Sequence, residues 1–145
     1  MFDLNKNKEQ NPIGELFNGL SQNQKMSLLN LLILVGLCDE QQANQDKVME
    51  YLNTYIKPLG VRANETMSYF REFGQQRMIE DLQSLPKNQM EFLVWASWEV
   101  ITCDGRPSEI EEKIAGSIFE KLGVNAEKYL SIIKFFNDLR KNYGG

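Results

Sequence analysis

Residues 20–39 read LSQNQKMSLLNLLILVGLCD, and residues 85–104 read LPKNQMEFLVWASWEVITCD. Each stretch is apolar on nearly all sides at helical spacing, which is typical of a central, buried helix, and each ends in Cys-Asp. Aligned at an offset of 65 residues, they share seven identities in twenty positions: Leu20/Leu85, Asn23/Asn88, Gln24/Gln89, Leu28/Leu93, Val35/Val100, Cys38/Cys103 and Asp39/Asp104. The sequence therefore predicts a core built on two related helices.

The similarity continues beyond these helices. After a two-residue gap, at an offset of 63, Leu59-Gly60-Val61 aligns with Leu122-Gly123-Val124, and Phe73 aligns with Phe136. We expect one helical unit to occur twice, as repeat one at about 20–73 and repeat two at about 85–136. Neither unit can bury its apolar face alone, so the two are expected to pack around a pseudo-twofold axis. Chance similarity between helices of like composition is the alternative.

Start and stop signals place the remaining elements. Ser21 is a candidate N-cap, Pro86 opens a helix, and Ser108 with Glu111 has capping-box spacing. Gly74 divides two shorter helices. A further helix is expected from residue 12 to about residue 20, after a flexible lead-in at 1–11. With no alternating strand pattern, the fold class is all-α, with about seven helices in a single domain over residues 12–145.

Composition excludes several classes of function. The chain has 145 residues, a net charge of −4 and no histidine, which excludes Ser-His and Cys-His nucleophile pairs and histidine-based zinc sites. The acidic balance makes nucleic acid an unexpected partner. No apolar run approaches the roughly 20 residues of a membrane span. Two cysteines form no disulfide framework, so a cytoplasmic location is expected.

The second repeat carries a motif that resembles a known family. Asp104-Gly105-Arg106-Pro107-Ser108-Glu109 follows an apolar helix and leads into one ending Leu122-Gly123-Val124. This arrangement resembles the Asp-Gly-x-x-x-Glu helix junction of TerB-like proteins, which are tellurite-resistance-associated proteins of bacteria, and the resemblance spans about residues 20–140. It implies an all-helical, internally symmetric protein of chemical stress response, with acidic residues at the helix junctions proposed to bind divalent metal. It implies no established enzymatic reaction.

The junction carboxylates are the candidate metal ligands: Asp39 and Asp46 in repeat one, Asp104 and Glu109 in repeat two. Oxygen ligands from helix ends that meet at a pseudo-twofold axis suit calcium or magnesium. Glu99 and Glu112 could extend the set. Repeat one departs from the family motif, because Glu40 replaces the junction glycine. Helix capping is the alternative role, because acidic residues are favoured in the first turn of a helix.

The preferred function is therefore a non-catalytic, TerB-like module that binds a divalent metal or a protein partner in stress response. The alternative is a metal-dependent hydrolase of a phosphorylated small molecule, which would need a pocket beside the carboxylates. Cys38 and Cys103 are either a redox or soft-ligand pair or small buried apolar residues, and the second role is favoured. Trp95 is expected in the core, packed with the face from Leu28 to Val35.

Overall fold

The computed structural model describes residues 19–38, 45–103 and 108–143. These residues form six helices and no strand, which confirms the all-α class. About seven helices were expected, and the first of them, with the lead-in at 1–11, lies largely outside the described residues. The helices are α2 (Gln22–Leu37), α3 (Gln45–Leu59), α4 (Ala63–Leu82), α5 (Lys87–Thr102), α6 (Glu109–Lys121) and α7 (Ala126–Tyr143).

The region around Gly74 differs in detail from the expectation of two separate short helices. Helix α4 runs through it as one element, but Gly74 has φ 80° and ψ −178°, which breaks the helical geometry. A positive φ is readily adopted only by glycine, and no atom lies within 4 Å of where a Cβ would stand. The expected division is therefore present as a break inside α4.

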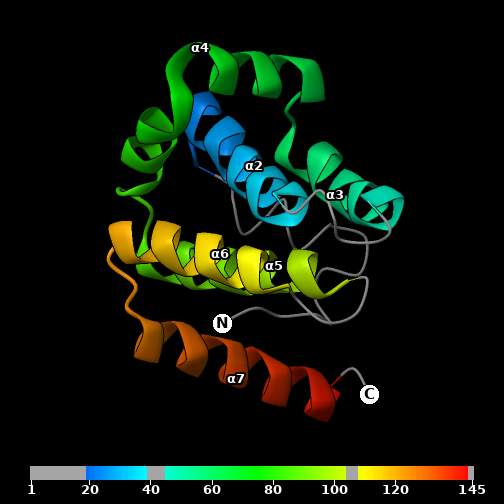
Figure 1. The fold of residues 1–145 in the computed structure, drawn as a ribbon, viewed down its shortest axis with the longest axis vertical. Coiled ribbons are helices and arrows are strands. Elements are labelled where there is room, and N and C mark those ends of the chain that lie inside the picture. The colour runs from blue at the N-terminus through cyan, green and yellow to red at the C-terminus, as the bar shows by residue number, and fades with distance from the viewer. Residues whose placement is uncertain (1–18, 39–44, 104–107, 144–145) are drawn as a thin grey trace.

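Helices α2 and α5 form the centre of the fold. Helix α2 packs against α3, α4, α5 and α6, while α5 packs against α2, α3, α6 and α7. Helices α4 and α7 lie at opposite ends of the molecule, with α2, α5 and α6 between them (Figure 1). Six leucines of these layers are fully buried and supply much of the core: Leu28, Leu29, Leu31, Leu32, Leu82 and Leu93.

Hydrogen bonds at the helix starts confirm the predicted caps. The Ser21 hydroxyl accepts from Gln24 N at 3.1 Å, and Gln24 Oε1 accepts from Ser21 N at 3.0 Å. Ser108 and Glu111 make the same reciprocal pair at 3.1 and 2.8 Å. Each box satisfies two backbone N–H groups that a helix start otherwise leaves without a partner. Helices α2 and α6 are thus fixed at their first turns.

Three polar side chains along α2 bind it to α4. Gln24, Ser27 and Asn30 follow each other at intervals of three residues, so they form a stripe on a largely apolar helix. Gln24 Nε2 donates to the Asp81 carbonyl oxygen at 3.3 Å, and Ser27 Oγ donates to Asp81 Oδ2 at 2.7 Å. Asn30 Nδ2 donates to the Thr66 carbonyl oxygen at 3.0 Å. We call these three residues the α2 polar stripe.

Aromatic contacts join α5 to α7. Trp95 stacks on Phe136 with ring centroids 5.6 Å apart and an interplanar angle of 20°, and Phe92 meets Phe136 edge-on at 6.4 Å. Trp95 is half-buried and packs outward onto α7, so its expected place in the core is wrong. Helix α5 is apolar on most sides, and its periodicity could not distinguish the side facing α2 from the side facing α7.

Candidate functional site

Four helix ends meet at one edge of the molecule, which we call the junction edge. It consists of the last turns of α2 and α5 and the first turns of α3 and α6, toward the right of Figure 1. Contact there is close: a Cβ added to Gly36 in α2 would lie 2.5 Å from Val100 Cγ1 in α5 and 2.9 Å from Val48 Cγ1 in α3. The absence of a side chain at Gly36 therefore lets these three helices approach one another.

Two of the four predicted ligands are described, and both lie at this edge. Asp39 and Asp104 lie outside the described residues, immediately after the C-caps of α2 and α5. Asp46 is exposed in the first turn of α3, and the Glu109 side chain, 86% exposed, begins α6. Across residues 19–38, 45–103 and 108–143, no three acidic or cysteine side chains form a group that could hold a metal. The described carboxylates alone make no metal centre.

Glu111, rather than Glu109, caps the start of α6. Glu111 is 1% exposed, and its Oε1 accepts from the Ser108 backbone in the capping box. Glu109 instead extends toward solvent, where Lys113 Nζ lies 3.9 Å from its Oε1. Such an exposed pair contributes little to stability. The cap function therefore belongs to Glu111, and the Glu109 carboxylate remains accessible at the junction edge.

The buried Tyr55 and the half-buried Tyr129 lie near Glu99 and Glu112, the acidic residues that could extend the ligand set. Burial, followed by the neighbouring Tyr51 and Glu99, raises the pKa of the Tyr55 hydroxyl well above its ordinary value. Burial and the charge of Glu112 raise the pKa of Tyr129 to about 12. Both hydroxyls are therefore protonated at neutral pH and add no negative charge to this region.

The two cysteines occupy matching positions as the C-caps of α2 and α5. Both are half-buried, and Cys38 Sγ lies 3.5 Å from the Val35 carbonyl oxygen. Half-burial at a helix end agrees with the role of a small apolar residue. Redox activity of the pair stays the untested alternative.

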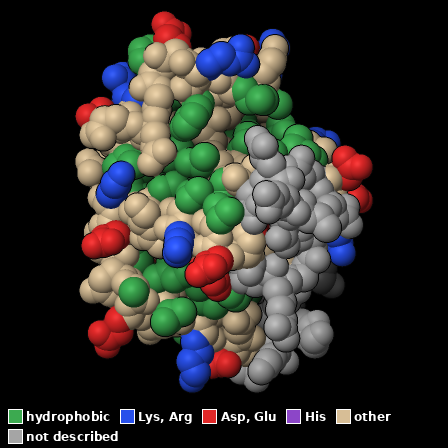
Figure 2. All heavy atoms as spheres, viewed as in Figure 1, with side chains coloured by type: hydrophobic (Ala, Val, Ile, Leu, Met, Phe, Trp, Pro, Cys, Tyr) green, Lys and Arg blue, Asp and Glu red, His purple; other side chains and the backbone are tan. Residues whose placement is uncertain are grey.

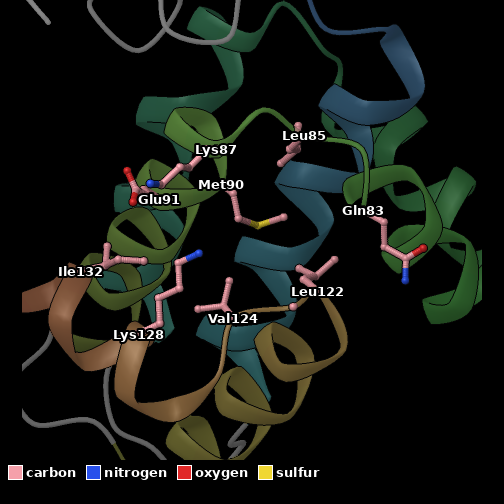
Figure 3. A pocket seen from close by; sticks show the side chains of 10 residues that line it. Gln83, Leu85, Lys87, Met90, Glu91, Leu122, Val124, Lys128 and Ile132 are labelled. Atoms are coloured by element: carbon pink, nitrogen blue, oxygen red, sulfur yellow. The ribbon is translucent and has the colours of Figure 1, made fainter.

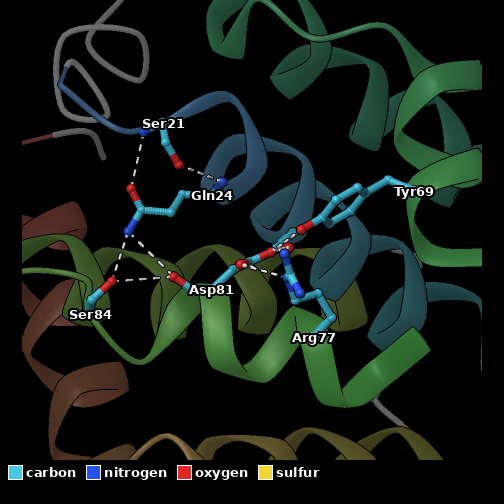
Figure 4. A network of polar contacts seen from close by, with 7 residues as sticks. Ser21, Gln24, Tyr69, Arg77, Asp81 and Ser84 are labelled. Atoms are coloured by element: carbon cyan, nitrogen blue, oxygen red, sulfur yellow. Dashed lines mark hydrogen bonds and ion pairs between the residues drawn. The ribbon is translucent and has the colours of Figure 1, made fainter. Parts of the chain in front are cut away.

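Sequence reasoning missed a polar cluster centred on Asp81, whose side chain is 14% exposed (Figure 4). Besides Ser27, Tyr69 donates its hydroxyl to Asp81 Oδ2 at 2.7 Å, and Arg77 Nε lies 3.6 Å from Asp81 Oδ1. Tyr69 precedes Gly74 and Asp81 follows it, so the carboxylate joins both parts of α4 to α2. No local signal reveals this cluster, because Ser27 and Asp81 are 54 residues apart.

The face shown in Figure 2 mixes hydrophobic side chains with charges of both signs. Among the described residues, no helix has the length and apolar character needed to cross a membrane. The chain matches no protein-family model, no curated protein and no solved structure. The TerB-like assignment thus rests on residues 104–109 and the helical pattern around them.

Proposed function

We propose that this chain is a TerB-like, non-catalytic module of bacterial stress response that binds calcium or magnesium at the junction edge. The ligands would be Asp39, Asp46, Asp104 and Glu109. The observation that carries the proposal is the meeting of four helix ends at this edge, because each ligand adjoins one of them. Asp39 and Asp104 follow the ends of α2 and α5, while Asp46 and Glu109 lie in the first turns of α3 and α6.

The helix order supports a repeated unit. Helices α2 and α5 both have 16 residues and start 65 residues apart, and α4 and α7 start 63 residues apart. In the two proposed units, α2, α3 and α4 correspond to α5, α6 and α7. The contacts agree with this correspondence, because α2–α4 has its equivalent in α5–α7 and α2–α6 has its equivalent in α3–α5. A pseudo-twofold axis through the α2–α5 contact would bring equivalent carboxylates to the same edge. The proposed cation would then lie near this axis.

The chemistry of the edge suits a hard cation. Carboxylate oxygens are the ligands that calcium and magnesium prefer, and both ions retain water as additional ligands. The carbonyl ends of α2 and α5 carry partial negative charge and the first turns of α3 and α6 carry partial positive charge, so the helix dipoles oppose one another here and the carboxylates supply the attraction for a cation. Both described carboxylates, Asp46 and Glu109, are accessible to an ion from solvent.

The described hollow lies away from the proposed ligands, so it is not the pocket of a hydrolase that uses them. A hydrolase would need a concave pocket beside its carboxylates. The hollow that the structure describes is lined by Lys87, at the start of α5, and by Leu122, just after the end of α6. The junction edge contains the opposite ends of both helices, about 20 Å away along their axes at 1.5 Å per residue. The hollow and the carboxylates therefore do not form one site.

Thermal unfolding in increasing calcium or magnesium tests the proposal. A cation that binds only the native state stabilises it by about 2.7 kcal/mol at one hundred times its Kd, so the wild type should melt at higher temperature. Asp39→Asn with Asp104→Asn should remove this increment and leave the helical circular dichroism signal unchanged. Glu72→Gln with Glu80→Gln, two exposed carboxylates of α4, is the matched control and should retain it. If calcium or magnesium changes the melting temperature of both double variants equally, the proposed site is refuted.

A further inference from the structure

A hollow of about 230 Å³ lies where the start of α5 meets the α6–α7 connection (Figure 3). Its lining is apolar toward the protein: Leu85, Met90, Leu122, Val124 and Ile132 are all at most 9% exposed. Polar side chains form much of the rest of the lining, and the apolar part favours a ligand with a hydrocarbon portion, because that portion is removed from water.

Three charged residues border the hollow. Lys87 and Glu91 extend from α5 and Lys128 extends from α7, so the charged border carries a net charge of +1. In Figure 3 the Lys128 side chain reaches toward Met90, whereas Lys87 and Glu91 lie next to one another away from it. Lys128 is therefore the cation best placed to meet a ligand that rests on the apolar lining.

The start of α5 adds to the positive potential. Its N-cap is Pro86, which makes no side-chain capping hydrogen bond, whereas α2 and α6 have complete capping boxes. The positive end of the α5 dipole thus adjoins the same hollow as the two lysines. The carbonyl ends of α4 and α6, at Gln83 and Leu122, adjoin the same hollow and oppose this dipole, so the net charge of +1 on the side chains is what favours an anion.

The volume limits the ligand. The hollow of about 230 Å³ lies below the roughly 300–1,000 Å³ of pockets for drug-sized ligands, so it suits a small ligand. We propose that the hollow binds a monocarboxylate on a short apolar chain, with the carboxylate at Lys128 and the chain on Met90, Leu122 and Val124. A free short-chain acid and the C-terminal residue of a peptide share this chemistry.

Methyl NMR titrations test the inference. Sodium hexanoate represents the free acid and N-acetyl-leucine the peptide terminus, with hexanamide, N-acetyl-leucinamide and hexylamine as uncharged or cationic controls. We expect at least one acid to shift the methyl signals of Met90, Leu122 and Val124 and its amide to bind about tenfold more weakly. Binding of N-acetyl-leucine alone would identify a peptide terminus as the source, and binding of hexanoate would identify a free acid.

Single substitutions at exposed lysines test where the carboxylate of the ligand binds, because an exposed lysine contributes little to the fold. Lys128→Gln should weaken binding about tenfold, and Lys87→Gln, beside Glu91, should weaken it less. Lys134→Gln on α7 is the matched control, since Lys134 pairs with Asp138 rather than bordering the hollow, and it should bind as the wild type does. The inference is wrong if neither acid shifts the methyl signals of Met90, Leu122 and Val124. It is also wrong if the amide and the amine bind as tightly as the acid, or if Lys128→Gln binds the acid as tightly as the wild type does.

The hollow and the junction edge can be tested separately. The double variant Asp39→Asn with Asp104→Asn should bind the carboxylate as the wild type does, because its changes lie at the opposite end of α5. Lys128→Gln should likewise keep the cation-dependent rise in melting temperature. Failure of one site therefore leaves the test of the other intact.

Discussion

Gly36→Ala is expected to destabilise the protein although alanine is the better helix former. The new Cβ would lie 2.5 Å from Val100 Cγ1 and 2.9 Å from Val48 Cγ1, which is too close for either methyl group. Valine is branched at Cβ and holds one preferred rotamer in a helix, so neither methyl can turn away at low cost. Helices α2, α3 and α5 must then move apart.

The magnitude follows from two opposing terms. Overpacking of a close-packed core costs about 1–3 kcal/mol. Replacing glycine by alanine inside a helix returns about 0.5–1 kcal/mol. We therefore expect a net loss of about 1–2 kcal/mol, which lowers the melting temperature by roughly 3–6 °C for a chain of this size.

Gly116→Ala is the matched control, because a Cβ at Gly116 in α6 meets no atom within 4 Å. It should stabilise the protein by about 0.5–1 kcal/mol, so the same substitution should change stability in opposite directions at the two sites. Urea unfolding followed by circular dichroism measures both. The double variant Gly36→Ala with Val100→Ala should lose less free energy of unfolding than the two single variants lose together, by about 1 kcal/mol. A Gly36→Ala protein as stable as Gly116→Ala would refute the close contact.

Three further predictions concern single interactions. Tyr69→Phe removes the hydrogen bond to Asp81 and should cost about 1 kcal/mol in urea unfolding; no loss would show that water replaces it. Ser108→Ala removes the α6 cap and should cost about 1 kcal/mol, whereas Ser108→Asp should retain most of it. The pKa of Tyr129 is raised to about 12 in the folded state, so stability should fall as the pH rises from 10 to 12. The stability of Tyr129→Phe should fall less than that of the wild type over this pH range, and an equal fall would contradict the raised pKa.

The sequence predicted the parts of the fold that depend on local chemistry. Ser21 and Ser108 mark helix starts because the hydrogen bonds of a capping box join residues only three positions apart. Gly74 marks a break because only glycine readily takes its φ of 80°. The side of α5 that faces α7 was missed, and Trp95 was placed in the core, because a helix apolar nearly all round has no preferred face.

The candidate sites depend on contacts between distant residues, which limits prediction from a single sequence. Carboxylates at the ends of two related helices suggested the junction edge, because repeated units bring equivalent positions together. The hollow gave no such signal, because Lys87 and Lys128 lie on different helices and neither belongs to a motif. Lys128 alone reads as part of the solvated face of an amphipathic helix.

The α2 polar stripe has a consequence for the uniqueness of the native state. Helix α2 is buried on most sides, so its apolar side chains distinguish only weakly between rotations about its axis, and the close contact at Gly36 restricts them further. Ser27 and Asn30 have partners only in one rotation, because every other rotation leaves a buried polar group without a hydrogen bond. The most apolar helix is thus oriented by its few polar atoms together with Gly36, and leucine at positions 27 and 30 would leave the orientation to packing shape alone.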